Sequence, residues 1–193
     1  MRKAVTTGLL IGMLLAACAG VAAPVGIGEK VGDFKLQDTA GNTHSLASYG
    51  GKVVVLVFWS FKCPTALAYD ERLAALQQKY GSGRVVVLAV ASNSNESKAE
   101  ILRNAGNLNL SFAILLDRDG LLADRLGATI TPSIYILDRG GVLRYRGALD
   151  NKEKPGDKKR EAYAEDAIDS LLAGQAVTNQ ETQASGCSIK RKP

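Results

Sequence analysis

The chain has 193 residues, of which 46% are apolar and 5 are proline, and its mean hydropathy is +0.00. This composition is typical of a globular domain and excludes a disordered, collagen-like or polytopic membrane protein. The net charge of +5 comes from five basic residues at the two ends, because the other basic residues equal the 19 acidic ones in number. A nucleic-acid-binding fold needs a basic surface, so we expect no nucleic-acid partner. With one histidine and three cysteines, we expect no metal or cofactor either.

The first 17 residues have the pattern of a secretory signal peptide. Two basic residues precede the uncharged stretch 4–17, which is shorter than the roughly 20 residues that span a bilayer but fits the apolar region of a signal peptide. The run Leu15-Ala16-Ala17-Cys18 resembles the lipobox of bacterial lipoproteins, so Cys18 is the expected lipidation site. Cleavage at a nearby small residue without lipidation is the alternative.

These features predict a location outside the cytoplasm. A lipid on Cys18 anchors the chain in the cell envelope, facing the periplasm, and Ala19 in place of an aspartate favours the outer membrane over the inner one. Without the lipid, the chain is expected to be periplasmic or secreted. The rest of the sequence divides into a tether at 18–30, one domain at 31–174 and a polar tail at 175–193.

The domain begins its regular structure with a strong strand signal. Residues 53–59 are continuously apolar and rich in β-branched side chains, which predicts a strand buried on both faces. A helix follows from Pro64, with apolar residues at steps of three and four, and Gly81 ends it. Residues 85–91 predict a second buried strand.

The remaining pattern continues the alternation of strands and helices. Ser97 and Glu100 have the spacing of a capping box, which starts a helix that reaches residue 105. Further elements are expected as a strand at 112–116, a helix at 121–126, an antiparallel hairpin formed by 134–137 and 142–145, and a helix at 161–173. This order predicts an α/β protein with a thioredoxin-like fold, in which helices flank a central mixed sheet.

Cys63 is the candidate catalytic residue. It ends the loop after the first strong strand and precedes Pro64, the expected first residue of a helix. Unpaired backbone amides and the helix dipole at such a position favour a thiolate, the nucleophilic form of cysteine. The alternative is that Cys63 is a small buried apolar residue.

Two segments carry a resemblance to a known family. Residues 58–64, Phe-Trp-Ser-Phe-Lys-Cys-Pro, together with Thr131-Pro132, resemble the redoxin branch of the thioredoxin superfamily, of the peroxiredoxin-like AhpC/TSA type. The resemblance runs from about residue 31 to residue 173. It implies that Cys63 is the redox nucleophile and that Thr131-Pro132 is a cis-proline that faces it and offers backbone to a substrate. Ser60 and Pro64 are the other residues expected at the substrate site.

The sequence also departs from this family. Ala66 stands where a Cys-X-X-Cys motif has its second cysteine, so Cys63 has no neighbour with which to form the usual local disulfide. Ser60 matches the hydroxyl that precedes a peroxide-reactive cysteine by three residues, but Leu56 occupies the position of the proline. A peroxide and a protein thiol or disulfide both remain open as substrates.

Cys187 in the tail is the third cysteine. If Cys18 carries lipid, Cys63 and Cys187 are the two thiols left for an intramolecular disulfide. We expect Cys187 to resolve oxidised Cys63, unless an external thiol reductant does so or Cys187 is an inert surface thiol. The sequence therefore predicts an envelope thiol oxidoreductase. The alternative is a non-catalytic module that holds a partner polypeptide in the cis-proline groove.

Overall fold

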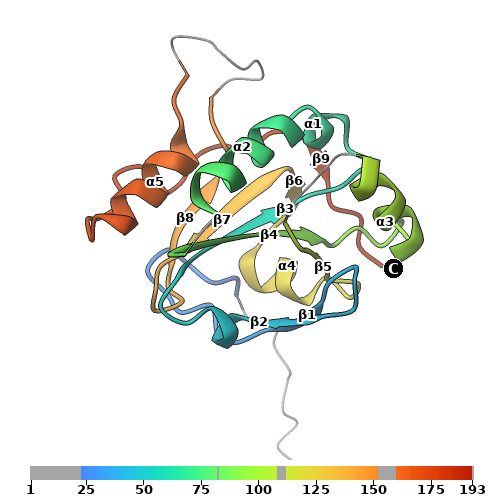
Figure 1. Ribbon diagram of the computed structural model, residues 1–193, viewed down its shortest axis with the longest axis horizontal. Helices are drawn as coiled ribbons and strands as arrows, with labels where there is room; N and C mark the ends of the chain where they lie inside the picture. The colour runs from blue at the N-terminus through green and yellow to red at the C-terminus, as the bar shows by residue number, and fades with distance from the viewer. Residues whose placement is uncertain (1–22, 82, 108–111, 152–159, 193) are drawn as a thin grey trace, which may run out of the picture.

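The computed structural model describes residues 23–81, 83–107, 112–151 and 160–192, and its centre is a five-stranded mixed sheet (Figure 1). In spatial order the strands are β5 (Ile114–Leu116), β4 (Val85–Ala91), β3 (Val53–Phe58), β7 (Ser133–Leu137) and β8 (Leu143–Gly147). Strands β3, β4 and β5 are parallel to one another, whereas β7 is antiparallel to both β3 and β8. The predicted hairpin and the predicted mixed sheet are confirmed.

Strand β3 lies in the middle of the sheet and is buried on both faces, as predicted. All six of its residues are at most 1% exposed. Val53, Val55 and Val57 pack into one apolar cluster, and the alternate residues pack into a second cluster on the other face. A strand with helices or other cover on both sides has no solvated face, so its sequence is apolar throughout rather than alternating.

The helices are α1 (Pro64–Leu67), α2 (Asp70–Tyr80), α3 (Lys98–Asn107), α4 (Leu121–Leu126) and α5 (Tyr163–Leu172). Helices α2 and α5 pack on the sheet face opposite to the one that α4 covers (Figure 1). The capping box of α3 is confirmed, since the amide of Ser97 donates to the Glu100 carboxylate at 2.8 Å and the Ser97 hydroxyl accepts from the Glu100 amide at 3.2 Å.

The helix predicted from Pro64 differs from the prediction because it is broken into α1 and α2. The amide of Tyr69 bonds to the carbonyl of Ala66, three residues back, instead of continuing the four-residue pattern. This tightened turn redirects the chain, and α2 then runs to Tyr80 as expected.

The N-terminal part of the described chain packs against the domain. A small hairpin, β1 (Lys35–Gln37) and β2 (Thr43–Ser45), leads into the 3₁₀ helix η1 (Leu46–Tyr49). Within the stretch expected to be a tether, Val25 and Gly28 donate backbone hydrogen bonds to the body of the domain, both at 2.8 Å. Cys18 and the predicted signal peptide lie outside the described residues. Among the helices that the structure describes, none has both the length and the apolar character needed to cross a membrane.

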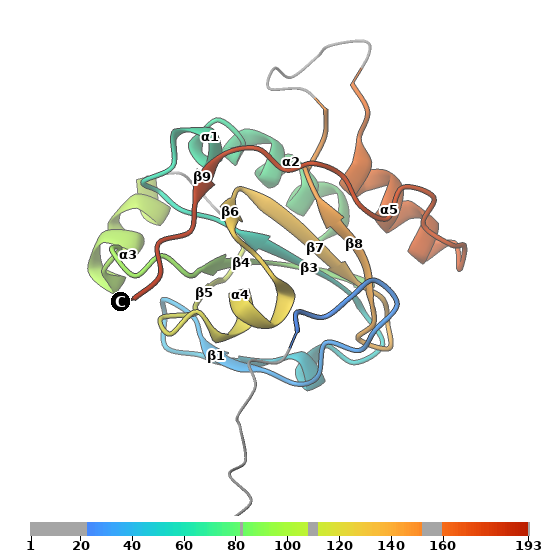
Figure 2. The same ribbon diagram turned by 180° about the vertical axis from the view of Figure 1, so that it is seen from behind.

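The C-terminal tail adds a two-stranded sheet that the sequence did not predict. Strand β9 (Cys187–Ser188) pairs antiparallel with β6 (Ile130–Thr131), the short strand before β7. Figure 2 shows the tail running from α5 across the molecule to lie beside β6, with α1 next to it. The tail is held on both sides of Cys187: the Arg146 amide donates to the Gln180 carbonyl at 2.9 Å, and the Ile189 amide donates to the Thr129 carbonyl at 2.8 Å.

Candidate active site

Cys63 lies at the N-terminal end of α1, just after the end of β3. It is the N-cap residue of this helix, with Pro64 in the first turn as predicted, and it is 1% exposed. The backbone amide of Ala66 donates a hydrogen bond to the Cys63 sulfur. Because α1 has only four residues, this direct hydrogen bond, rather than the dipole of a long helix, stabilises a negative charge on Cys63.

The loop before β7 presents a cis-proline to Cys63. The Thr131-Pro132 peptide bond is cis, and the Cys63 thiol donates to the Thr131 carbonyl oxygen, with a sulfur-to-oxygen distance of 3.0 Å. The predicted cis bond and its contact with Cys63 are therefore confirmed. Both residues of the bond are buried.

Strand β9 brings Cys187 to the same place. Its antiparallel register sets Cys187 opposite Thr131, whose carbonyl accepts from the Cys63 thiol, and Cys187 packs against the apolar cluster that contains Cys63. The backbone amide of Thr65 bonds to the Cys187 sulfur. Both cysteines are free thiols here, Cys63 buried and Cys187 half-buried. Residues that lie 124 positions apart in the sequence thus form a thiol pair.

The surroundings of the pair shift the two thiol pKa values in opposite directions. Burial alone would raise the pKa of Cys63, but hydrogen bonds from Cys187 and from the Ala66 amide outweigh it, so this pKa lies below its ordinary value. The pKa of Cys187 is raised, first because its thiol donates to Cys63 and then because of burial. Cys63 is consequently the more acidic thiol of the pair.

Gly186 allows β9 to approach the cis-proline loop so closely. Its φ angle is +156°, and a β-carbon at this position would lie 2.1 Å from the Thr131 carbonyl oxygen and 3.1 Å from Pro132 Cδ. No side chain fits in that space, so a glycine is required here. The glycine that precedes Cys187 was the one sequence signal for this contact.

Ser60 is buried next to this pair and takes part in a network that the sequence did not reveal. Its hydroxyl donates to the carboxylate of Glu96 and accepts from the Lys62 amide at 3.1 Å. The other carboxylate oxygen of Glu96, which is 0% exposed, has no hydrogen-bond partner among the described residues. The ammonium of Lys62 bonds to the Asn95 carbonyl oxygen instead of approaching Cys63. The predicted contact of Ser60 and Pro64 with a substrate stays a prediction.

A second buried carboxyl group, Asp70, lies at the start of α2. It accepts a hydrogen bond from the indole nitrogen of Trp59 at 2.9 Å, and its other oxygen has no hydrogen-bond partner in the part of the chain that the structure describes. Burial raises the pKa of Asp70 to about 6, although the bond from Trp59 acts to lower it. No motif in the sequence identified Asp70 as a residue of the site.

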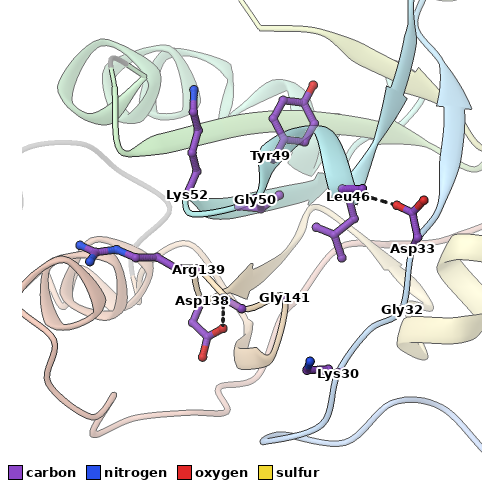
Figure 3. Close-up of a pocket in the computed structure, with 13 residues that line it drawn as sticks. Lys30, Gly32, Asp33, Leu46, Tyr49, Gly50, Lys52, Asp138, Arg139 and Gly141 are labelled. Atoms are coloured by element: carbon purple, nitrogen blue, oxygen red, sulfur yellow. Dashed lines mark hydrogen bonds between the residues drawn. The ribbon is translucent and has the colours of Figure 1, made fainter.

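A separate hollow of about 250 Å³ lies at the opposite end of the sheet (Figure 3). Lys30, Tyr49, Lys52 and Arg139 are among its lining residues. Lys52 precedes β3, whereas Cys63 follows the other end of that strand. This hollow therefore plays no part in the chemistry of the two cysteines.

A thioredoxin-like sheet that places one cysteine at a helix start, facing a cis-proline, defines a redoxin. Residues 27–146 match the model of the AhpC/TSA family, and the chain belongs to this family. The sequence-based prediction of the redoxin branch is thereby confirmed. Cys187 lies beyond the matched residues.

The relatives agree with this assignment. The thioredoxin-like protein YneN of Bacillus subtilis is 32% identical over 128 residues, which cover 65% of this chain and 75% of that protein. The thiol-disulfide oxidoreductase ResA of Geobacillus thermodenitrificans is 32% identical over 123 residues, which cover 62% and 68%. The solved structure of an uncharacterised conserved protein from Geobacillus kaustophilus superposes with a TM-score of 0.79 at 28% identity, covering 87% of this chain and 93% of that one. These names agree with the expectation of a thiol oxidoreductase.

Proposed function

We propose that this protein is a thiol-disulfide oxidoreductase whose redox couple consists of Cys63 and Cys187. The observation that carries the proposal is that both cysteines meet at Thr131: β9 sets Cys187 opposite Thr131, and the Thr131 carbonyl accepts the hydrogen bond of the Cys63 thiol. The tail supplies the second cysteine that Ala66 leaves out of the usual motif. Tertiary packing of the tail, instead of a local Cys-X-X-Cys sequence, brings the two cysteines together.

The redox step transfers two electrons. The Cys63 and Cys187 thiols give up two protons and two electrons and become one disulfide, while a partner disulfide takes up both and becomes two thiols. Cys63 supplies the thiolate that closes the bridge, because hydrogen bonds stabilise its negative charge. Cys187 is held beside it, so closure requires no large movement of the chain.

The alternative of a non-catalytic module in the cis-proline groove has less support. The backbone edge at Thr131, which would pair with an extended partner polypeptide, is already paired with Cys187 of the same chain. Further hydrogen bonds hold the tail there, including the bond from the Lys190 amide to Asn93 at 2.6 Å. A partner strand would have to displace this segment before it could bind.

Membership of the AhpC/TSA family keeps peroxide as a second candidate substrate. The Ser60 hydroxyl, however, is occupied by Glu96 and the Lys62 amide, and Leu56 is buried in β3 at the position of the family's proline. These contacts favour a disulfide over a peroxide. Reduced protein should therefore react faster with a disulfide than with hydrogen peroxide at equal concentration, as measured by stopped-flow fluorescence of Trp59.

The location is proposed from the sequence alone. We infer that residues 1–17 direct export, that Cys18 carries lipid, and that the domain works in the cell envelope facing the periplasm, anchored to the outer membrane. An oxidising compartment suits a protein that cycles between a dithiol and a disulfide.

The couple is tested by mild oxidation of the purified protein followed by peptide mapping under non-reducing conditions. We expect a linked pair of peptides that contain Cys63 and Cys187. The variants Cys63→Ser and Cys187→Ser should each lose disulfide reductase turnover, whereas Ser188→Ala, which alters the exposed neighbour of Cys187 on β9, should keep it. Full turnover in Cys187→Ser would show that Cys63 works without the tail.

A further inference from the structure

The two sulfurs of the couple differ in how solvent reaches them. Cys63 is 1% exposed and belongs to the apolar cluster that contains Trp59 and Ala66. Cys187 lies on β9 and is only half-buried. A thiol arriving from solvent therefore meets Cys187 first.

The geometry of disulfide exchange strengthens this difference. The attacking sulfur approaches along the line of the sulfur-sulfur bond, on the side opposite the sulfur that leaves, and access decides which sulfur is attacked. Attack on Cys63 of a Cys63–Cys187 bridge would have to come from the protein side, where the Thr131 carbonyl and the apolar cluster lie. Attack on Cys187 comes from the solvent side.

The site is also built to receive a negative charge on Cys63. The amides of Ala66 and Cys187 both donate to the Cys63 sulfur. The pKa of Cys63 is lowered and that of Cys187 is raised, and the thiol with the lower pKa is the better leaving group in exchange. When the disulfide is reduced, electrostatics and access thus both make Cys63 the leaving sulfur and Cys187 the sulfur that is attacked.

We propose that Cys187 is the sulfur that exchanges with external thiols and disulfides, and that Cys63 is the buried partner that leaves as a thiolate. This assignment rests on the proposed Cys63–Cys187 couple and reverses the roles expected from the sequence, in which Cys187 resolves an adduct on Cys63. The reductant is a dithiol, or two molecules of a monothiol.

The reduction proceeds in two balanced steps. A thiolate of the reductant attacks Cys187, the bond between Cys63 and Cys187 breaks, and its electron pair stays on Cys63. The second thiolate of the reductant then attacks the first reductant sulfur in the mixed disulfide on Cys187. The oxidised reductant departs, and Cys187 takes up a proton. Two electrons have moved from the reductant to the pair.

The first experiment maps the mixed disulfide. Oxidised full-length protein with Cys18→Ser is mixed briefly with limiting glutathione, quenched with acid, alkylated and digested. We expect glutathione on Cys187 and the alkyl group on Cys63, and the reverse pattern overturns the assignment. Failure to form any Cys63–Cys187 disulfide beforehand is a different result, because it refutes the proposed couple itself.

The second experiment separates access from acidity. In the Cys18→Ser background, Cys63→Ser leaves Cys187 alone and Cys187→Ser leaves Cys63 alone, and each reacts with the aromatic disulfide 5,5′-dithiobis(2-nitrobenzoic acid). Acidity alone favours Cys63, whereas access favours Cys187. We expect the protein that retains Cys63 to react at least about tenfold more slowly, equivalent to an opening cost of about 1.4 kcal/mol. Equal or faster reaction of Cys63 contradicts the proposal.

Gly186→Ala completes this test. Added to Cys187→Ser, it displaces the tail from Thr131, because its β-carbon collides with the backbone there. Cys63 should then regain most of the lost reactivity. A persistently slow reaction would show that something other than the tail shields Cys63, and it would remove the reason for assigning external exchange to Cys187.

Discussion

Gly186→Ala is the sharpest test of how the tail assembles the cysteine pair. In the native backbone the new β-carbon would lie 2.1 Å from the Thr131 carbonyl oxygen and 2.9 Å from the carbonyl carbon, about 0.9 Å inside the closest approach that real contacts show. Both atoms belong to the backbone, so no rotation of a side chain relieves the collision. Strand β9 must therefore move away from β6.

The cost follows from the contacts that this shift disturbs. Alanine at a positive φ angle costs roughly 1–2 kcal/mol, and weakening a hydrogen bond such as that from Ile189 to Thr129 costs about 1 kcal/mol more. We expect the docked tail to lose about 2–3 kcal/mol, which lowers the equilibrium constant for the Cys63–Cys187 disulfide roughly 30- to 150-fold.

The assay is a redox titration of the protein in glutathione buffers, with the oxidised fraction measured by alkylation and mass spectrometry. Gly174→Ala is the matched control. Gly174 also has a positive φ angle, +73°, but its β-carbon would meet no heavy atom within 4 Å, so it adds the strain without the collision. It should leave the titration unchanged. If the Gly186→Ala curve superposes on that of the unmodified protein, close approach of the tail does not assemble the pair.

Three further predictions concern stability and targeting. Because burial raises the pKa of Asp70 from 3.8 to about 6, ionising it costs the folded state up to about 3 kcal/mol, a cost that appears as pH rises from about 4 to above 6. Asp70→Asn should therefore be more stable than the unmodified protein above pH 7 in urea unfolding. Because Trp59 bonds to Asp70, the fluorescence of Trp59 should change near pH 6 in the unmodified protein and not in Asp70→Asn. A change that persists in Asp70→Asn would belong to another titrating group. Asp150→Ala removes the buried carboxylate that pairs with Arg72 at 2.6 Å and Arg160 at 2.7 Å. Thermal unfolding should show that the free energy of unfolding falls by about 3 kcal/mol. A fall below about 1 kcal/mol would mean that these ion pairs contribute little to stability. Cys18→Ala should release the protein from the membrane fraction, and retention there would contradict lipidation.

Much of the fold was predictable because its elements carry local signals. The apolar run of β3, the capping residues Ser97 and Glu100 and the glycine-rich turn of the β7–β8 hairpin each specify backbone structure over a few residues. The break between α1 and α2 was not predictable from the same pattern, since apolar residues recur at helical spacing on both sides of Tyr69.

The residues of the candidate site likewise fall into those with a local sequence signal and those without one. Cys63 and Pro64 could be recognised from the sequence because a strand, a loop and a helix start follow one another within a few residues, and the resemblance to a family identified the cis-proline. Glu96 and Asp70 could not be recognised, since their burial depends on how distant elements pack around them.

The sequence by itself determined the order of strands and helices, the class of protein and the reactive cysteine, because hydrophobic periodicity and short motifs act locally. Only the tertiary structure decided where the tail lies, and with it the partner of Cys63. Strand β9 is two residues long and has no hydrophobic pattern of its own. Its position depends on a glycine that fits against Thr131 and on hydrogen bonds to residues far away in the chain. Such pairing exists only after the domain has folded, and it converts two separate cysteines into one thiol pair.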